Sequence, residues 1–526
     1  MSQKDTAPPP DRFNFARHLI EVNAGRAAKT ALIDDAGQLS YGQLADQVRR
    51  CSAALTALGL LREDRVLLLM HDCSDWVVSF LGALHAGVVP VCVNTLLTAK
   101  DYAYMLADSR AQAALVSTAL LPTLQTAMSD GKHELKQLIV SRSQAPLPEG
   151  AHDWAALVSA ATPGTGADTH GDEPAFWLYS SGSTGAPKGT VHTQVNLYWT
   201  AELYGKGVLR LQDSDVVFSA AKLFFAYGLG NALSFPLSVG ASVVLMAERP
   251  TPQACFKRMT EHRPTVFCGA PTGYGGMLAA PDLPPRSAVS LRLCSSAGEA
   301  LPRDIGERWT AHFGCEIIDG IGSTEMLHIF LSNRPGDVRY GTTGKAVPGY
   351  EVQLRDEDGS VITSHNQIGD LYIQGPSAAL MYWNNRAKSR DTFQGPWTKS
   401  GDKYVRDPDG YYTYAGRNDD MLKVSGIYVS PFEVEATLVQ HNAVLEAAVI
   451  GKNDDEGLTK TKAFVVLKPG HHATEAELQA FVKEKLAPYK YPRFIEFVSE
   501  LPKTATGKIQ RFKLRELENQ RLFVHR

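Results

Sequence analysis

A run of glycine, hydroxyl and lysine residues at 179–189, YSSGSTGAPKG, is suited to holding phosphate groups. Its three glycines allow backbone N–H groups to approach an anion closely, and its four hydroxyl residues and Lys188 can donate further hydrogen bonds. The spacing differs from the GxxxxGK[ST] of P-loop nucleotidases and from the GxGxxG of dinucleotide-binding folds. The run therefore predicts an anion-binding loop of another kind, with a flexible surface loop as the alternative.

The elements that must position this loop alternate between helical and strand-like patterns. Residues 175–178, directly before the loop, resemble a strand, and 41–58 and 76–86 have helical spacing of apolar residues. Further strands are predicted at 65–70, 88–93, 241–246, 265–268 and 316–318. Such alternation indicates βαβ units and mainly parallel sheets, so the fold class is α/β.

The pattern changes after about residue 345. Short strands at 348–354, 369–374 and 411–414 lie among Gly, Asp and Asn turns, which predicts an antiparallel or barrel-like section. The last hundred residues could bury a small α+β core of their own, with helices at 431–441 and 474–486 and strands at 447–451 and 461–467. We predict a large N-terminal domain at 1–418 and a small C-terminal domain at 419–526.

The composition excludes several classes of protein. With 53 Lys and Arg against 56 Asp and Glu, the formal charge is 53 − 56 = −3, so bulk attraction to nucleic acid or to an anionic membrane is not expected. The apolar stretch at 76–93 is shorter than a membrane span. Seven cysteines without a CxxC pair, and an N-terminus without an apolar core, predict buried thiols in a cytoplasmic protein.

Five motifs in chain order carry a resemblance to a known family. After the loop at 179–189 come DGIGSTE at 319–325, KSGDKY at 399–404, GRNDDMLKVSGIYVSPFEVE at 416–435 and LPKTATGKIQR at 501–511. Together they resemble the adenylate-forming enzymes, which include acyl- and aryl-CoA ligases. The segments LFFAYGLGN (223–231) and STEMLHIFLSN (323–333) are similar to the benzoate-activating branch of that family.

The resemblance implies two half-reactions and a role for each phosphate-binding residue. A carboxylate attacks the α-phosphate of ATP to give an acyl-adenylate and diphosphate, and the thiol of coenzyme A then releases AMP and a thioester. Glu325 would be the Mg²⁺ ligand and Thr324 a phosphate contact. The β- and γ-phosphates would be held by Ser181, Gly182, Ser183, Thr184, Gly185 and Lys188.

The same resemblance assigns the rest of the nucleotide site. Asp402 would accept hydrogen bonds from the ribose hydroxyls, and Arg417 would also reach the nucleotide. The segments flanking adenine would be Gly298, Glu299, Ala300, Asp319, Gly320 and Ile321. Many relatives have an aromatic residue where this chain has Ile321, so the stacking on adenine is weaker here.

Three positions would couple the half-reactions through a mobile C-terminal domain. Asp419 matches the hinge of the family. Lys508 would enter the site for adenylation and contact both the carboxylate and the α-phosphate. Gly426, in the loop at 423–426, would let the pantetheine of coenzyme A pass close to the backbone during thioester formation.

The acyl pocket is predicted from similarity to benzoate-activating enzymes. Phe225 replaces a histidine of many relatives, so that histidine's role does not apply. The pocket would be lined by Ala226, Tyr227, Ala297, Gly322, His328 and Ile329. Small residues would admit a flat ring and Tyr227 and Ile329 would supply apolar walls, while His328 would bond a ring substituent or close the pocket.

These residues predict an ATP-dependent ligase that joins benzoate to coenzyme A. The partners would be a small aromatic carboxylate, ATP and coenzyme A, with no nucleic acid or membrane, and a homodimer is one option for its assembly. Alternatives are a ligase for another aryl or alicyclic acid, such as hydroxybenzoate, aminobenzoate or cyclohexanecarboxylate, or an enzyme that loads a carrier protein. A non-catalytic nucleotide-binding module is the alternative from a different class.

Overall fold

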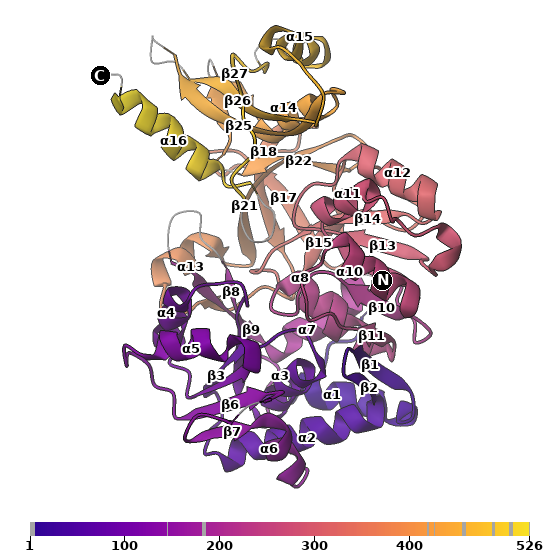
Figure 1. The fold of residues 1–526 in the computed structure, drawn as a ribbon, viewed down its shortest axis with the longest axis vertical. Helices are drawn as coiled ribbons and strands as arrows, with labels where there is room; N and C mark the ends of the chain where they lie inside the picture. The colour runs from indigo at the N-terminus through magenta and orange to yellow at the C-terminus, as the bar shows by residue number, and fades with distance from the viewer. Residues whose placement is uncertain are drawn as a thin grey trace. The chain divides into compact units, whose positions relative to one another are not determined.

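The computed structural model describes residues 6–144, 146–180, 186–417, 420–424, 427–454, 459–486, 490–503 and 509–524. The chain divides into two units, which Figure 1 shows as ribbons. Unit 1 comprises Met1–Tyr340, Gly344–Glu351 and Ile373–Thr398, and unit 2 comprises Gly341–Thr343, Val352–Tyr372 and Lys399–Arg526. The predicted boundary between 418 and 419 lies outside the described residues and stays a prediction.

An eight-stranded sheet in unit 1 carries the predicted phosphate loop. Its strands are mainly parallel, but β8, β9 and β19 at one edge pair antiparallel. The order is β19 (Met381–Tyr382), β9 (Lys188–Thr193), β8 (Pro174–Ser180), β4 (Val89–Cys92), β3 (Arg65–Leu69), β5 (Ala113–Ser117), β6 (Gln137–Ser141) and β7 (Ala151–Asp153).

A nine-stranded sheet in unit 1 carries the predicted adenine and acyl segments. The strands from β14 to β1 pair parallel, and antiparallel pairs close both edges. The order is β16 (Lys345–Ala346), β15 (Ile329–Ser332), β14 (Ile317–Gly322), β13 (Leu293–Ser296), β12 (Val266–Gly269), β10 (Val216–Ser219), β11 (Ser242–Val244), β1 (Thr30–Asp34) and β2 (Gly37–Ser40).

Helices cover both faces of both sheets in unit 1. Alternate residues of β3 enter different apolar clusters: Val66 and Leu68 pack with helices α2 and α3, whereas Leu67 and Leu69 pack with α4 and α5. The first cluster also contains Leu32 of the nine-stranded sheet, so one core joins the two sheets. The helices of unit 1 are α1 (Phe15–Val22), α2 (Tyr41–Ala57), α3 (Ser74–Ala86), α4 (Ala99–Ser109), α5 (Leu121–Met128), α6 (Trp154–Ala160), α7 (Gln194–Thr200), α8 (Ala226–Leu229), α9 (Phe235–Val239), α10 (Pro252–Glu261), α11 (Pro271–Ala279), α12 (Arg303–Phe313) and α13 (Arg386–Thr392).

Unit 2 contains the predicted small α+β core. Alternate residues of β25 and β26 face different helices, α14 and α15 on one side and α16 on the other. A five-stranded sheet, in which β17, β18 and β21 contribute residues to both units, forms the predicted β section. The elements of this sheet and of unit 2 are β17 (Glu351–Arg355), β18 (Ile368–Gln374), β20 (Phe393–Gln394, in unit 1), β21 (Trp397–Arg406), β22 (Tyr412–Arg417), β23 (Leu422–Val424), β24 (Ile427–Val429), α14 (Pro431–Val439), β25 (Val444–Asn453), β26 (Thr459–Leu467), α15 (Glu475–Lys485), β27 (Phe494–Phe497) and α16 (Arg511–Val524).

Local sequence explains several boundaries and one error. Helix α2 starts at a capping box in which Ser40 and Gln43 satisfy each other's backbone N–H groups, and α3 ends at Gly87 with a φ of 72°. The predicted strand at 348–354 was wrong at its start, because Gly349 has a φ of 98° and Tyr350 N bonds Val347 O in a turn. β17 therefore begins at Glu351.

Two π-helical segments were not predicted. η3 (Ala201–Lys206) follows α7, and η4 (Gly230–Ser234) separates α8 from α9. Such segments insert an extra residue into a helix and occur frequently at functional sites. Three 3₁₀ turns complete the described elements: η1 (Ala24–Arg26), η2 (Thr118–Leu120) and η5 (Arg286–Ala288).

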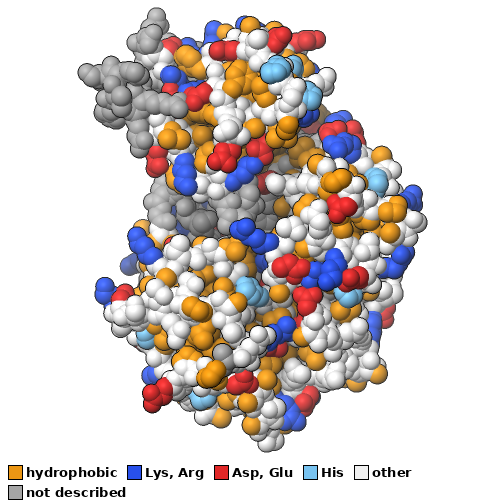
Figure 2. Space-filling view, in the orientation of Figure 1, with side chains coloured by type: hydrophobic (Ala, Val, Ile, Leu, Met, Phe, Trp, Pro, Cys, Tyr) orange, Lys and Arg blue, Asp and Glu red, His pale blue; other side chains and the backbone are white. Residues whose placement is uncertain are grey.

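The predicted burial of the thiols agrees with the structure. On the face shown in Figure 2, acidic and basic side chains are interspersed, as the formal charge of −3 implies. All seven cysteines are buried and free. None of the helices in the described part of the chain is long and apolar enough to cross a membrane.

We expect the start of α16 to depend on a buried ion pair. Arg511 donates two hydrogen bonds to Glu435, of 3.0 and 2.6 Å, and Glu435 Oε1 also accepts from Val449 N at 2.7 Å. Glu435→Ala leaves this guanidinium without its main partner, so the unfolding free energy of unit 2 should fall by about 3 kcal/mol in chemical denaturation. The control Glu446→Ala breaks the more exposed pair with Lys503 and should change it by less than about 1 kcal/mol. Equal losses in both variants would contradict this expectation.

Candidate functional site

The described stems of the phosphate loop lie side by side at the end of the β8–β9 hairpin. Ser180 of β8 and Lys188 of β9 are register partners, so these two residues lie beside each other on adjacent strands. Several predicted residues lie outside the described residues, and their roles stay predictions. These are Ser181, Gly182, Ser183, Thr184, Gly185, Asp419, Gly426 and Lys508.

Lys188 and Glu325 meet at one tyrosine, although 137 residues separate them in the chain. The Tyr382 hydroxyl donates a hydrogen bond of 2.7 Å to Glu325 Oε1, and Lys188 Nζ lies 4.6 Å from the centroid of the Tyr382 ring. Tyr382 belongs to β19, which pairs with β9. The side chain of Tyr382, at the edge of the eight-stranded sheet, therefore contacts both a cation and a carboxylate.

The chemistry of Glu325 fits Mg²⁺ held partly by a substrate. The carboxylate is half-buried, and Oε2 has no hydrogen-bond partner among the described residues. Within the same residues, no group of three or more His, Cys, Asp or Glu gathers as a metal site. One carboxylate combined with phosphate oxygens and waters is a common arrangement for Mg²⁺.

The strand predicted at 316–318 is longer than expected and includes Gly320 and Gly322. Both residues belong to β14 and pair with β15. A Cβ at Gly320 would lie 2.8 Å from Leu331 O, and one at Gly322 would lie 2.5 Å from His328 O. Glycine is required because the neighbouring backbone is so close. The turn follows at 323–328, where buried Leu327 has a φ of 66°.

The structure brings the predicted acyl residues together. His328 Nε2 donates to Tyr227 O at 3.3 Å, and their rings are 5.5 Å apart. Gly322 and Ile329 are register partners, and Ala297 directly follows β13. Ala226 starts α8 beside Tyr227. His328 and Ile329 are buried, whereas Ala226, Tyr227 and Gly322 are partly accessible, so the latter three would form the open side of a pocket.

His328 is buried and neutral. Burial lowers its pKa to about 3, so it offers no positive charge to a carboxylate. Its ring is surrounded by Tyr204 of η3, Phe235 after η4, and Tyr227. Its Nδ1 is buried with no hydrogen-bond partner in the described part of the chain. Since Nε2 is the donor, this nitrogen remains an acceptor.

Ser295 was not predicted from the sequence, and it holds the hydroxyl of Tyr227. The Tyr227 hydroxyl donates to Ser295 Oγ at 2.9 Å, and Tyr274 donates to Ser295 O at 2.8 Å. Ser295 is fully buried on β13. Its only signal in the sequence is a serine pair within a strand that is otherwise apolar.

The predicted adenine segments lie at the ends of β13 and β14. Gly298 is exposed with a φ of 98°, and Glu299 accepts a hydrogen bond of 2.7 Å from Thr272. Ala300 and Ile321 are partly buried. Asp319 is buried, and Asn333 N bonds its carbonyl at 2.9 Å. Asp319 thus fixes this end of β14 through a backbone contact with Asn333.

Asp402 and Arg417 meet in unit 2. They are register partners on β21 and β22, and Arg417 Nη1 lies 3.5 Å from Asp402 Oδ1. Asp402 is mostly buried, whereas half of the Arg417 side chain is exposed. The arginine therefore orients the carboxylate while its own end stays accessible.

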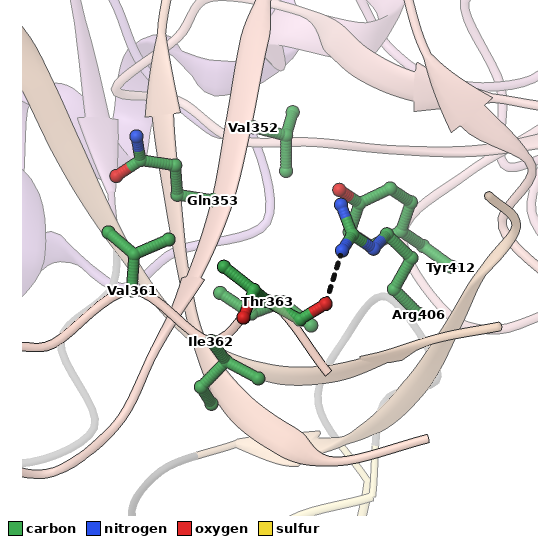
Figure 3. A pocket seen from close by; sticks show the side chains of 8 residues that line it. Val352, Gln353, Val361, Ile362, Thr363, Arg406 and Tyr412 are labelled. Carbon is green, nitrogen blue, oxygen red and sulfur yellow. Dashed lines mark hydrogen bonds between the residues drawn. The ribbon is translucent and has the colours of Figure 1, made fainter. Parts of the chain in front are cut away.

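A small cavity in unit 2 contains none of the predicted site residues. It has a volume of about 100 Å³, below that of ordinary ligand pockets, and the Arg406 guanidinium crosses it to bond Thr363 O at 3.2 Å (Figure 3). It is lined by Val352, Gln353, Leu354, Val361, Ile362, Thr363, Arg406 and Tyr412. We therefore exclude it as the reaction site.

Comparison with known proteins decides the family. Residues 20–383 match the family described as AMP-binding enzyme, and 433–508 match the AMP-binding enzyme C-terminal domain. The chain belongs to the AMP-binding enzyme family. It has the adenylate-forming fold, with a large N-terminal and a small C-terminal domain of mixed α/β sheets, so the predicted fold class is confirmed.

Three relatives illustrate the similarity to other AMP-binding enzymes. Benzoate–CoA ligase of Thauera aromatica is 59% identical over 513 residues, 96% of both chains. A crystal structure of a benzoate CoA ligase from Burkholderia xenovorans LB400 is 61% identical with a TM-score of 0.89, covering 96% of this chain and all of that one. A structure of an anthranilate CoA ligase with anthranoyl-AMP is 43% identical with a TM-score of 0.93, covering 99% of this chain and all of that one.

We expect Asp319 to make stability depend on pH. Burial raises the pKa of its carboxyl from 3.8 to about 8 in the folded chain. Its stabilising contribution is therefore fully present below about pH 4 and is lost as the pH rises toward 8. In Asp319→Asn the unfolding free energy should vary less between pH 4 and 8, as measured in denaturant. Asp304→Asn changes an exposed carboxylate and should keep the wild-type slope; an unchanged slope in Asp319→Asn would refute the expectation.

Proposed function

We propose that the chain is an ATP-dependent benzoate–CoA ligase that forms benzoyl-CoA, AMP and diphosphate through a benzoyl-adenylate. The convergence of Lys188 and Glu325 on Tyr382, within one unit that also holds Tyr227 and His328, supports the adenylation step. The identity of 59% and 61% to the two benzoate ligases supports the choice of acid.

Each of the predicted residues would have a separate role in adenylation. Lys188 would contact the β- and γ-phosphates, and Glu325 would hold Mg²⁺, which when bound supplies positive charge to the triphosphate. Thr324 would contact a phosphate oxygen. The ammonium of Lys508 would bond the carboxylate and the α-phosphate as charge develops between them. For coenzyme A, we propose that the loop containing Gly426 serves the second half-reaction after rotation at Asp419.

The pocket would recognise an uncharged ring. Tyr227 and Ile329 supply apolar walls, and no Lys or Arg is among the predicted lining residues to pair with a second carboxylate. Since His328 is neutral, the charge on the acid must be balanced elsewhere, and Lys508 would do so. We also propose a cytoplasmic location.

A hydroxybenzoate or aminobenzoate is the second candidate. His328 Nδ1 is a buried acceptor without a partner among the described residues, and a ring hydroxyl or amino group could donate to it. The similarity to an anthranilate ligase points in the same direction.

The deciding experiment measures AMP formation with Mg·ATP and coenzyme A for benzoate, 4-hydroxybenzoate, 2-aminobenzoate, cyclohexanecarboxylate and hexanoate. We expect the highest kcat/KM with benzoate. A higher value for a substituted acid would support the second candidate. The absence of coenzyme A-dependent turnover with every acid would contradict both, and a carrier-protein acceptor or a non-catalytic nucleotide binder would then be favoured.

Replacing Lys508 should abolish the first half-reaction. Lys508→Ala removes the charge that would stabilise the α-phosphate during adenylyl transfer, so benzoate-dependent exchange of diphosphate into ATP should fall at least about 100-fold. Lys503→Ala removes a lysine of the same motif that pairs with Glu446, and exchange should stay within about twofold of wild type. Equal effects of the two substitutions would refute the role of Lys508.

A further inference from the structure

The turn that carries Thr324 and Glu325 is held by its carbonyl groups. Three consecutive carbonyls accept hydrogen bonds from outside the turn: Thr324 O from His192, Glu325 O from Ala379 N and Met326 O from Ser377 Oγ, each at 2.7 Å. His192 lies on β9, four residues after Lys188, and residues 377–379 lead into β19. The turn therefore depends on the edge of the sheet that carries the phosphate loop.

The contact from His192 has a defined tautomer. Asn196 Nδ2 lies 3.2 Å from Ala378 O, an atom that only accepts, so this side of the amide is the nitrogen. The same nitrogen donates to His192 Nδ1 at 2.8 Å. Nδ1 therefore carries no proton, and Nε2–H donates to Thr324 O. The Thr193 hydroxyl donates a hydrogen bond of 2.8 Å to the amide oxygen of Asn196, which completes the chain of hydrogen bonds.

This chain of hydrogen bonds is buried and fully paired. His192, Thr193 and Asn196 are each at most 3% exposed, and Phe176 stacks on the imidazole at 5.1 Å with planes 15° apart. Burial lowers the pKa of His192 to about 4, so the ring is neutral at physiological pH and keeps its donor. A network without unpaired members fixes geometry better than an isolated contact.

We infer that His192 is a positioning residue for adenylation, which holds Thr324 and Glu325 in place against the β8–β9 hairpin through its hydrogen bond to Thr324 O. The inference rests on the proposed function of that site. His192 itself would touch neither ATP nor the acid. Tyr382, on the strand next to β9, holds the side chain of Glu325 through its hydrogen bond to Oε1.

The two half-reactions should respond differently to loss of this bond. The β- and γ-phosphates and their Mg²⁺ are present only during adenylate formation. A displaced Thr324 or Glu325 would therefore weaken that step and leave the reaction of a preformed adenylate with coenzyme A nearly intact. General destabilisation would reduce both steps equally.

The test compares substitutions that keep or remove the donor at the Nε2 position. In His192→Phe the ring still stacks on Phe176 but cannot donate, so KM for ATP in benzoate-dependent diphosphate exchange should rise about tenfold. Thioester formation from synthetic benzoyl-AMP and coenzyme A should stay within about twofold. His192→Gln places an amide N–H near the former Nε2 and should restore exchange to within about threefold.

If His192→Phe does not fold, two substitutions that both introduce an amide, His192→Asn and His192→Gln, still test the inference. His192→Asn has the same functional group as His192→Gln, but its side chain is too short to reach Thr324 O, so only the glutamine variant should keep a normal KM. Equal KM values for the two amide variants, or equal losses in both half-reactions, would overturn the inference.

Binding of Mg·ATP without any acid separates this inference from the proposed function. By calorimetry, the dissociation constant should be about tenfold higher for His192→Asn than for His192→Gln. If the wild type binds Mg·ATP but does not activate benzoate, the choice of acid fails while the role of His192 is still decided by this ratio. Equal dissociation constants would overturn that role.

Discussion

A turn that leaves regular strand pairing must find a donor for each of its carbonyl groups, because an unpaired buried carbonyl is costly. The turn at 323–328 finds its donors on β9 and on residues 377–379, segments that lie far before and after it in the chain. Consequently, the eight-stranded and nine-stranded sheets are joined at the residues predicted to handle phosphate and metal. The positive φ of Leu327 is sustained by these contacts.

Much of the fold could be predicted because the apolar pattern is strong where strands are buried on both faces. β3 and β4 and helices α2 and α3 lie close to their predicted ranges. The errors occur where contacts between backbone segments determine the ends of a strand. Gly349 forms part of a turn where a strand was predicted to start, so that strand begins later, and Gly320 and Gly322 are strand residues that permit close approach of β15. The presence of a glycine in the sequence does not reveal whether it forms a turn or allows two strands to approach closely.

The candidate site could be predicted in part because its residues occur in recognisable order along the chain. Thr324, Glu325 and Lys188 are such residues. By contrast, Tyr382, His192 and Ser295 act through contacts with distant segments, and a single sequence does not show which distant residues are in contact. The electrostatic result for His328 also needed the structure, since its neutrality follows from burial by Tyr204, Tyr227 and Phe235.

The two π-helical segments make the surroundings of His328 depend on the number of residues in the chain. One additional residue in a helix rotates everything that follows by about 100° around the helix axis. Tyr204 lies within η3 and Phe235 directly after η4, and both rings face His328. Removal of one residue from either segment would turn an aromatic wall away from that imidazole. The aromatic packing around His328 thus depends on the number of residues as much as on their identity.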